Sequence, residues 1–349
     1  MKLLYSNIKP CEYSNSTFSE AFESGILNSD EIKIATGYIT EESLLELKSI
    51  LLFYLDEGKV KTCSLVLGMH GREGFTRTQY EAAIDLASFL KDKNIGSVHV
   101  CTAFKFHGKT YLFYKAGEPI SGMLGSSNLS NIVDSRQWEV DVFFTENEAL
   151  RDLESLHSDL VKKASHNILD WKPAAFNASR DLLKNRIGVE KADPETYREV
   201  ENALTDTVFD LPLKTTEKSN LNAYFGKGRL ATKTGAIRPR HWYEAELIVP
   251  REITSSPTYP KNGSVIRVFT DDGWSFKCKI EGQNGKNFRS ENDLRTLGRW
   301  IKGRLENAGC LKVGQPVTKE VLDKYGRHTI SLKQTIKPDL WLLDFSNKR

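Results

Sequence analysis

The 349-residue sequence has little of what marks a secreted, zinc-binding or membrane protein. Its five cysteines are odd in number, lie far apart and are never spaced as CxxC, which argues against a disulfide framework and against a zinc site. No run of eighteen apolar residues occurs, so we expect no membrane span. The first residues lack the apolar core of a signal peptide, and we therefore expect a cytoplasmic protein with reduced thiols.

The sequence also has little net charge, +3 overall, but this charge is unevenly distributed. Residues 221–310 contain 16 Lys and Arg against 9 Asp and Glu, a net charge of +7, so the rest of the chain carries −4. A basic region in a nearly neutral protein is typical of a polyanion-binding surface, although plain solvated surfaces also show such excesses. The composition is 39% hydrophobic and 27% charged, as in globular proteins, and the length predicts two domains.

Strand-like and helix-like stretches alternate over the first 170 residues. The apolar patterns predict strands at 31–40, 62–68, 97–100, 110–114, 122–124 and 139–144, and helices at 41–55, 80–90 and 148–164. This alternation predicts an α/β domain with a largely parallel or mixed sheet over residues 1–172.

The C-terminal part of the chain has a different texture. Residues 173–220 contain three prolines, many charges and little periodicity, and we predict a connecting region there with a helical part at 197–204. Beyond it, we predict short strands at 244–249, 264–269, 275–280, 330–332 and 340–345, and one amphipathic helix at 292–308. Residues 221–349 are thus predicted to form a β-rich domain, a small open barrel, with Trp274, Phe276 and Trp300 in its core.

The residues that suggest chemistry lie between positions 106 and 139. His107 and Lys109 are two apart at the start of a predicted strand, so alternation places both side chains on one face. Ser126 and Asn128 follow Gly125 at the end of the next strand and could donate hydrogen bonds to a phosphate. A neutral imidazole can attack phosphorus, and a lysine can stabilise the equatorial oxygens. Glu139 could hold the second imidazole nitrogen. Either short pattern alone occurs by chance, but the ordered set predicts phosphodiester hydrolysis without a metal.

These residues resemble the signature HxK…GSxN of the phospholipase D superfamily. An aspartate usually stands five residues after the lysine in that superfamily, but this sequence has Tyr114 there. The departure weakens a lipase assignment and is similar to the BfiI-like restriction endonuclease branch. Members of that branch also place a glutamate eleven residues after the motif asparagine, where this sequence has Glu139. The turn Gly37-Tyr38 likewise resembles the glycine-aromatic turn near the active site in that branch.

The C-terminal part resembles the B3-like DNA-recognition domain of the NgoFVII and NgoAVII restriction enzymes. The resemblance rests on the stretches HWYE at 241–244, TDDGW at 270–274 and NGKNFRS at 284–290. It implies a seven-stranded open barrel that holds the DNA major groove with two arms. We assign the first arm to Lys227, Arg229, Lys233, Arg238 and Arg240, interleaved with Tyr224, Phe225, Trp242 and Tyr243. We assign the second arm to Asn284, Lys286, Asn287, Arg289 and Ser290, where Arg and Lys suit guanine edges and Asn suits adenine.

A single HxK motif implies a shared active site. The reaction of this superfamily needs two histidines, one to attack phosphorus and one to protonate the leaving oxygen. The six other histidines have no lysine two residues on. We therefore predict a homodimer whose one site uses both copies of His107, Lys109, Ser126, Asn128 and Glu139, with no metal or other cofactor for hydrolysis.

Two other functions fit the same residues. One is a phospholipase D-type nuclease or phosphodiesterase without sequence preference, which the basic C-terminal domain disfavours. The other is a DNA-binding regulator whose nuclease-like domain is vestigial, which the complete motif set disfavours. The resemblance further implies double-stranded DNA as partner, and possible work with a helicase-like ATPase, hence with ATP, and with a cognate cytosine methyltransferase.

Overall fold

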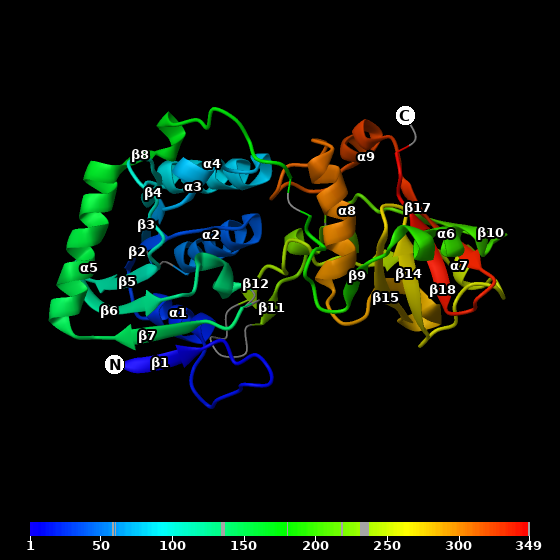
Figure 1. Cartoon of the computed structure of the whole chain (residues 1–349), viewed down its shortest axis with the longest axis horizontal. Coiled ribbons are helices and arrows are strands. Elements are labelled where there is room, and N and C mark those ends of the chain that lie inside the picture. Colours follow the sequence, from blue (N-terminus) through cyan, green and yellow to red (C-terminus); the bar gives the residue numbers. More distant parts are fainter. Residues whose placement is uncertain are drawn as a thin grey trace. The chain divides into compact units, whose positions relative to one another are not determined.

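The computed structural model describes residues 1–57, 59, 61–133, 137–179, 181–217, 219–230 and 237–347, except for the side chains of 237 and 238. Contacts within the chain divide it into two compact units, Met1–Ser179 and Arg180–Arg349. Each unit has its own large sheet (Figure 1).

The first unit is built on a mixed eight-stranded sheet with the order β1-β7-β6-β5-β2-β3-β4-β8. Its strands are β1 (Lys2–Tyr5), β2 (Glu31–Thr36), β3 (Thr62–Leu67), β4 (Gly96–Cys101), β5 (Thr110–Lys115), β6 (Glu118–Gly125), β7 (Val140–Phe144) and β8 (Ser165–Asn167). The three strands β2, β3 and β4 are parallel, whereas all other neighbours pair antiparallel. The predicted mixed α/β sheet is confirmed.

Helices cover both faces of this sheet, with α5 on one face and α1, α2 and α4 on the other (Figure 1). The helices are α1 (Phe18–Leu27), α2 (Glu41–Asp56), α3 (His70–Glu73), α4 (Arg77–Asp92) and α5 (Asn147–Asp159), which a π-helical turn, Leu160–Ala164, continues; 3-10 turns lie at Leu129–Ile132 and Ile168–Asp170. The three long helices on one face each begin after a threonine: Thr17, Thr40 and Thr76. Each threonine side chain accepts a hydrogen bond from the backbone three residues on, which fixes where the helix starts.

Strand pairing brings four segments of the chain to one edge of the first sheet. Ala35 at the end of β2 pairs with Thr110 at the start of β5, because these strands are antiparallel. Thr110 in turn pairs with Leu124 near the end of β6. Gly125 pairs with Asp141 near the start of β7. The segments that follow β2, precede β5, follow β6 and precede β7 therefore meet at this edge.

The second unit contains a curled sheet with the order β10-β17-β18-β14-β15-β16-β13, and β9 also pairs with β15. The strands are β9 (Val189–Lys191), β10 (Leu204–Pro212), β13 (Leu247–Ile248), β14 (Val265–Thr270), β15 (Trp274–Glu281), β16 (Asn287–Ser290), β17 (Thr329–Thr335) and β18 (Leu340–Asp344); β11 (Arg229–Leu230) and β12 (Ile237–Arg238) form a separate pair. The helices are α6 (Pro194–Asn202), α7 (Arg251–Thr254), α8 (Arg295–Asn307) and α9 (Lys319–Tyr325), with 3-10 turns at Asn220–Phe225 and Gln283–Gly285. The predicted β-rich, barrel-like fold is confirmed.

The predicted connecting region, residues 173–220, needs correction. Strand β9 pairs with β15, and β10 pairs with β17, so both belong to the sheet of the second unit. The helix α6 lies between them and begins at Pro194, which fits the first turn because proline there loses no hydrogen bond. The sequence suggested a linker because most residues of β10 are only partly buried or exposed, which gives a weak apolar signal.

The core of the second unit includes the aromatic residues expected there. Trp274, Phe276 and Trp300 are 7%, 3% and 2% exposed. The indole nitrogen of Trp300 on α8 donates to Asp272 (2.9 Å), in the turn between β14 and β15, so this turn fixes the helix against the sheet. In neither unit does a described helix combine the length and apolarity needed to cross a membrane.

Candidate active site and DNA-facing residues

His107 and Lys109 come together just before β5. The side chain of His107 is exposed, whereas Lys109 is buried. The ammonium nitrogen of Lys109 lies 3.2 Å from Nδ1 and 3.1 Å from Nε2 of His107, and donates to the His107 carbonyl at 2.7 Å. A lysine ammonium can only donate, so it can bond an imidazole nitrogen only where that nitrogen carries a free lone pair.

Gly37 and Tyr38, which follow β2, form the wall behind the His107 ring. A Cβ atom at Gly37 would lie 3.1 Å from Cδ2 of His107 and 3.4 Å from Oδ1 of Asn128, so a side chain there would crowd both. The ring of Tyr38 meets the ring of His107 edge-on, with centroids 5.6 Å apart. Its hydroxyl donates to Glu73 (2.7 Å), which also pairs with Lys105. This bond to Glu73 raises the pKa of Tyr38.

Asn128 is held with its amide oxygen toward β2. That oxygen accepts from the backbone N–H of Tyr38 (3.0 Å) and from the hydroxyl of Thr36 (3.3 Å). The amide NH2 group is then left to donate elsewhere. Thr36 is fully buried and also accepts from the N–H of Leu129, so it connects β2 to the turn after β6. Sequence reasoning missed Thr36, because its role depends on the pairing of distant strands.

Ser126 binds backbone rather than another site residue. Its hydroxyl accepts from the N–H of Val140 (3.0 Å) and makes a long hydrogen bond to the Val140 carbonyl (3.3 Å). This position fixes the start of β7, and so the backbone beside Glu139. Gly125 is required just before it, because a Cβ atom there would come within 2.3 Å of an Asp141 oxygen and 2.5 Å of the Val140 carbonyl.

Asp141 and Ser127 form a buried support that the sequence analysis did not identify. Asp141 is 2% exposed and accepts from the hydroxyl (2.5 Å) and the N–H (3.0 Å) of Ser127. Burial raises the pKa of Asp141, while these hydrogen bonds and the charge of Lys109 oppose the rise. The signal available was alternation, since Asp141 stands two residues after Glu139 on the same strand pattern.

Glu139 influences Lys109 by charge. Burial lowers the pKa of Lys109, and the negative charges of Glu139 and Asp141 partly offset this. The Glu139 backbone is fixed by two hydrogen bonds to Ser6. In the described part of the chain the His107 ring nitrogens contact Lys109, and no hydrogen bond joins them to Glu139. The orienting role predicted for Glu139 therefore stays a prediction.

His70, which has an arginine rather than a lysine two residues on, has a structural position. Its Nε2 accepts from the N–H of Ile39 (3.2 Å), and its Nδ1 lies 3.0 Å from the carbonyl of Gly74. Both ring nitrogens are thus engaged with backbone, and the ring stacks on Phe75 with centroids 4.5 Å apart. Among the described residues, no group of three or more His, Cys, Asp or Glu could hold a metal ion.

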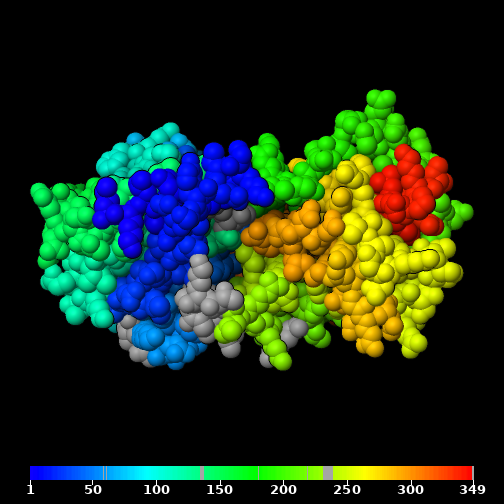
Figure 2. Space-filling view, turned by 90° about the horizontal axis from the view of Figure 1, so that it is seen from below, coloured from blue at the N-terminus to red at the C-terminus, as the bar shows by residue number. Residues whose placement is uncertain are grey.

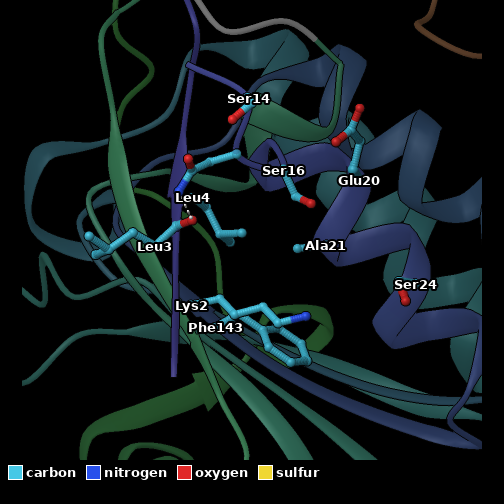
Figure 3. Close-up of a pocket in the computed structure, with 10 residues that line it drawn as sticks. Lys2, Leu3, Leu4, Ser14, Ser16, Glu20, Ala21, Ser24 and Phe143 are labelled. Carbon is cyan, nitrogen blue, oxygen red and sulfur yellow. Dashed lines mark hydrogen bonds between the residues drawn. The ribbon is translucent and has the colours of Figure 1, made fainter. Parts of the chain in front are cut away.

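A pocket of about 450 Å³ lies elsewhere in the first unit, between β1 and α1 (Figure 3). Lys2, Ser16 and Glu20 are among the residues that line it. None of the predicted site residues contributes to its wall. The open edge of the sheet at His107, rather than this pocket, is therefore the candidate active site.

The residues assigned to the first arm differ in their exposure. Lys227 and Arg229 are exposed, and the yellow-green segment before residue 250 reaches the surface in Figure 2. Arg229 and Arg240 both pair with the buried carboxylate of Glu244. Lys233 lies outside the described residues, as does the side chain of Arg238. Two of the interleaved aromatics, Trp242 and Tyr243, are core residues at 2% and 0% exposure.

The second arm consists of a 3-10 turn followed by strand β16. Asn284 and Lys286 are exposed, and Asn284 has a positive φ of 59° that asparagine tolerates. Asn287 and Arg289 lie on β16 and contact Glu246. Ser290 is 2% exposed, and its hydroxyl accepts from the N–H of Leu297 on α8 (3.2 Å). We therefore remove Ser290 from the set of DNA-facing residues.

Family models match both parts of the chain. Residues 16–170 match the NgoFVII restriction endonuclease N-terminal PLD domain, which spans the cluster around His107. Residues 199–336 match the NgoFVII C-terminal B3-like DNA-binding domain. The chain belongs to the NgoFVII restriction endonuclease family. In this NgoFVII-type protein the first unit is a phospholipase D-type nuclease domain and the second is a DNA-binding domain, so DNA is its partner.

Solved structures show weak similarity to parts of the chain. A phosphatidylserine synthase from Haemophilus influenzae is 13% identical with a TM-score of 0.35; the match covers 47% of this chain and 39% of the synthase. Nuc, a phospholipase D family member from Salmonella typhimurium, is 13% identical with a TM-score of 0.33, and the match covers 48% of this chain and 95% of Nuc. NucT from Helicobacter pylori is 12% identical with a TM-score of 0.30, and the match covers 42% of this chain and 87% of NucT. No curated protein matches the chain significantly.

Proposed function

We propose that this NgoFVII-type protein is a sequence-specific restriction endonuclease of the cytoplasm that hydrolyses DNA through a covalent phosphohistidine at His107. The observation that carries the proposal is the contact between an exposed imidazole and a buried lysine at the sheet edge, with Asn128 held beside them. An exposed ring can reach phosphorus, and a neutral imidazole is a nucleophile for it. A helicase-like ATPase and a cognate cytosine methyltransferase remain proposed partners, with ATP used only through the former.

The reaction proceeds in two displacements. In the first, a ring nitrogen of His107 bonds to phosphorus, the bond to the 3′ or 5′ oxygen breaks, and a second histidine protonates the leaving oxygen. In the second, that histidine takes a proton from water, whose oxygen bonds to phosphorus and breaks the phosphorus–nitrogen bond. Since the chain has one HxK motif, the second histidine is His107 of a second copy. Glu139 orients one of these imidazoles and completes the shared site.

Lys109 supplies fixed positive charge to the phosphate. In the absence of DNA the Lys109 ammonium contacts the His107 ring. A phosphate bound beside both side chains would accept the hydrogen bonds that the ammonium now gives to this ring. Asn128 adds two N–H donors. Ser126 can turn toward the same phosphate, because its bond to the Val140 carbonyl is long.

Substitution of Lys109 by methionine is expected to slow cleavage by about 10²- to 10³-fold, the usual cost of losing one preorganised donor to a transition state. Methionine keeps the buried chain length, so thermal unfolding should change little. Single-turnover rates on plasmid DNA measure this effect. Lys115→Met is the matched control, because Lys115 is exposed at the far end of β5. Equal losses in the two variants would contradict the role given to Lys109.

Chelation tests the metal-free chemistry. We expect plasmid cleavage at an unchanged rate in EDTA, because lysine and histidine perform the work that bound cations perform elsewhere. Sequencing the product ends, with and without EDTA, would show whether the same defined positions are cut. Strict dependence on Mg²⁺ would refute His107 as nucleophile. Ends scattered over random sequence would favour the nuclease without sequence preference, and intact plasmid would favour the regulator.

A further inference from the structure

A short segment between the two arms carries two largely buried carboxylates. In Glu244-Ala245-Glu246, which leads into β13, Glu244 is 4% exposed, and the Glu246 side chain is 11% exposed. Carboxylates are rarely buried unless cationic or hydrogen-bonding partners compensate the lost hydration. The partners of these two are residues of the arms.

Glu244 holds the first arm. One of its oxygens lies 2.6 Å from the guanidinium of Arg229 and also pairs with the guanidinium of Arg240. Arg229 and Arg240 are separated in sequence by the rest of this arm, so one carboxylate brings its two ends together. Burial lowers the pKa of Lys302 on α8 to about 7, although the negative charges of Glu306 and Glu244 oppose this.

Glu246 holds the second arm. One of its oxygens lies 3.5 Å from the guanidinium of Arg289, and the other accepts from the amide of Asn287 at 3.5 Å. Asn220 also donates to the second oxygen, at 2.9 Å, and helps to fix the carboxylate. Glu281 on β15 also pairs with Arg289. Each arm therefore has a carboxylate in the same three-residue segment.

These pairs leave hydrogen-bonding capacity unused. Nε of Arg240, Nε of Arg289 and Oδ1 of Asn287 are buried atoms that have no hydrogen-bond partner within the described residues. Buried polar atoms without partners are uncommon, and each costs free energy until it is satisfied. Eight such atoms occur among the described residues, and these three belong to arm residues, so the arm residues keep hydrogen-bonding capacity that a bound base edge can use.

We infer that Glu244 and Glu246 are specificity-determining residues for DNA recognition; this inference rests on the sequence-specific function proposed above. In the unbound protein these carboxylates occupy the arm residues, and on DNA binding their negative charge would oppose the approach of phosphates. Random DNA offers only phosphates, which must compete with these carboxylates. A cognate sequence adds base-edge acceptors and donors for Arg289, Asn287 and Arg240, and so replaces the lost contacts.

The substitutions Glu244→Gln and Glu246→Gln test the inference. Each is expected to increase affinity for random duplex by about 3- to 10-fold at low salt, because a charge that repels phosphates is removed. Each is also expected to lower the ratio of random to cognate dissociation constants by about 3- to 10-fold, because base contacts on cognate DNA already offset the carboxylates. Titrations use the full-length protein, a duplex selected by wild type from a random library, and a random duplex of equal length.

Matched variants separate specificity from charge and folding. Glu190→Gln removes a carboxylate that pairs with Arg267 (3.1 Å) outside the arms, and should leave the ratio at its wild-type value. Glu246→Asp keeps the charge and should largely restore the ratio, while thermal unfolding checks that all variants fold. A variant that keeps the wild-type ratio, including one that loses affinity equally on both duplexes, would overturn the inference and leave the proposed function standing. A wild-type protein that selects no sequence would overturn the proposed function and the inference with it.

Discussion

Replacement of His107 by alanine is expected to slow DNA cleavage by about 10⁴-fold or more, because nothing else in the cluster can form the covalent intermediate. The side chain is exposed and contacts chiefly Lys109, Tyr38 and Gly37, so its loss should not unfold the protein. Affinity for DNA should persist, since the second unit and Lys109 remain. Single-turnover cleavage and DNA titrations on the same preparation measure the two properties separately.

A matched histidine and a trapping experiment sharpen this result. His166 is also exposed but lies on β8, where it bonds the hydroxyl of Thr102 (2.9 Å), and His166→Ala should cleave at the wild-type rate. Wild-type protein denatured in alkali during cleavage should retain labelled DNA, because a phosphohistidine survives there, and His107→Ala should retain none. Substantial cleavage by His107→Ala would assign the nucleophile to another residue.

The contact between His107 and Lys109 and the turn position of Asn128 could be predicted from sequence because the motif is local. Alternation alone places His107 and Lys109 on one face, and a strand end places Asn128 in a turn. The glycine-aromatic turn at Gly37 was also visible, through a resemblance. What holds these segments together was not visible in the sequence. Thr36 on β2 bonds the turn after β6, and a single sequence does not show that β2, β5 and β6 are neighbours in the sheet.

The second unit was predicted less completely, for two physical reasons. The residues of β10 alternate only weakly between buried and exposed, so the segment resembled a linker. The arm residues were chosen for charge and polarity, which does not reveal their partners. Glu244 lies far in sequence from Arg229, and Glu246 lies far from Arg289. Only the folded chain shows that the members of each pair neutralise one another. Ser290 was a wrong choice for the same reason, since its hydroxyl serves the start of α8.

Mixed dimers of wild type and His107→Ala are expected to be as inactive as the His107→Ala dimer. In a shared site one imidazole attacks phosphorus and the other protonates the leaving oxygen, so each cut needs both copies. Two independent sites would instead leave a mixed dimer with about half of the wild-type rate. Two affinity tags, one on each chain, allow the mixed dimer to be purified and its cleavage rate to be measured.

The control for this experiment is a mixed dimer of wild type and His166→Ala, which should cut DNA at the wild-type rate. It shows that tagging and purification leave the site intact. Reisolation through both tags after the assay excludes exchange of subunits, which would regenerate wild-type dimers.

The wild-type dimer itself should also be detected by sedimentation, since a monomer that cuts DNA would have to find its second proton donor within one chain. His70 is already bonded to backbone through both ring nitrogens, so it is not free to act as that donor. Half-activity in the mixed dimer would therefore count against the shared site and would also require a different acid for the leaving oxygen.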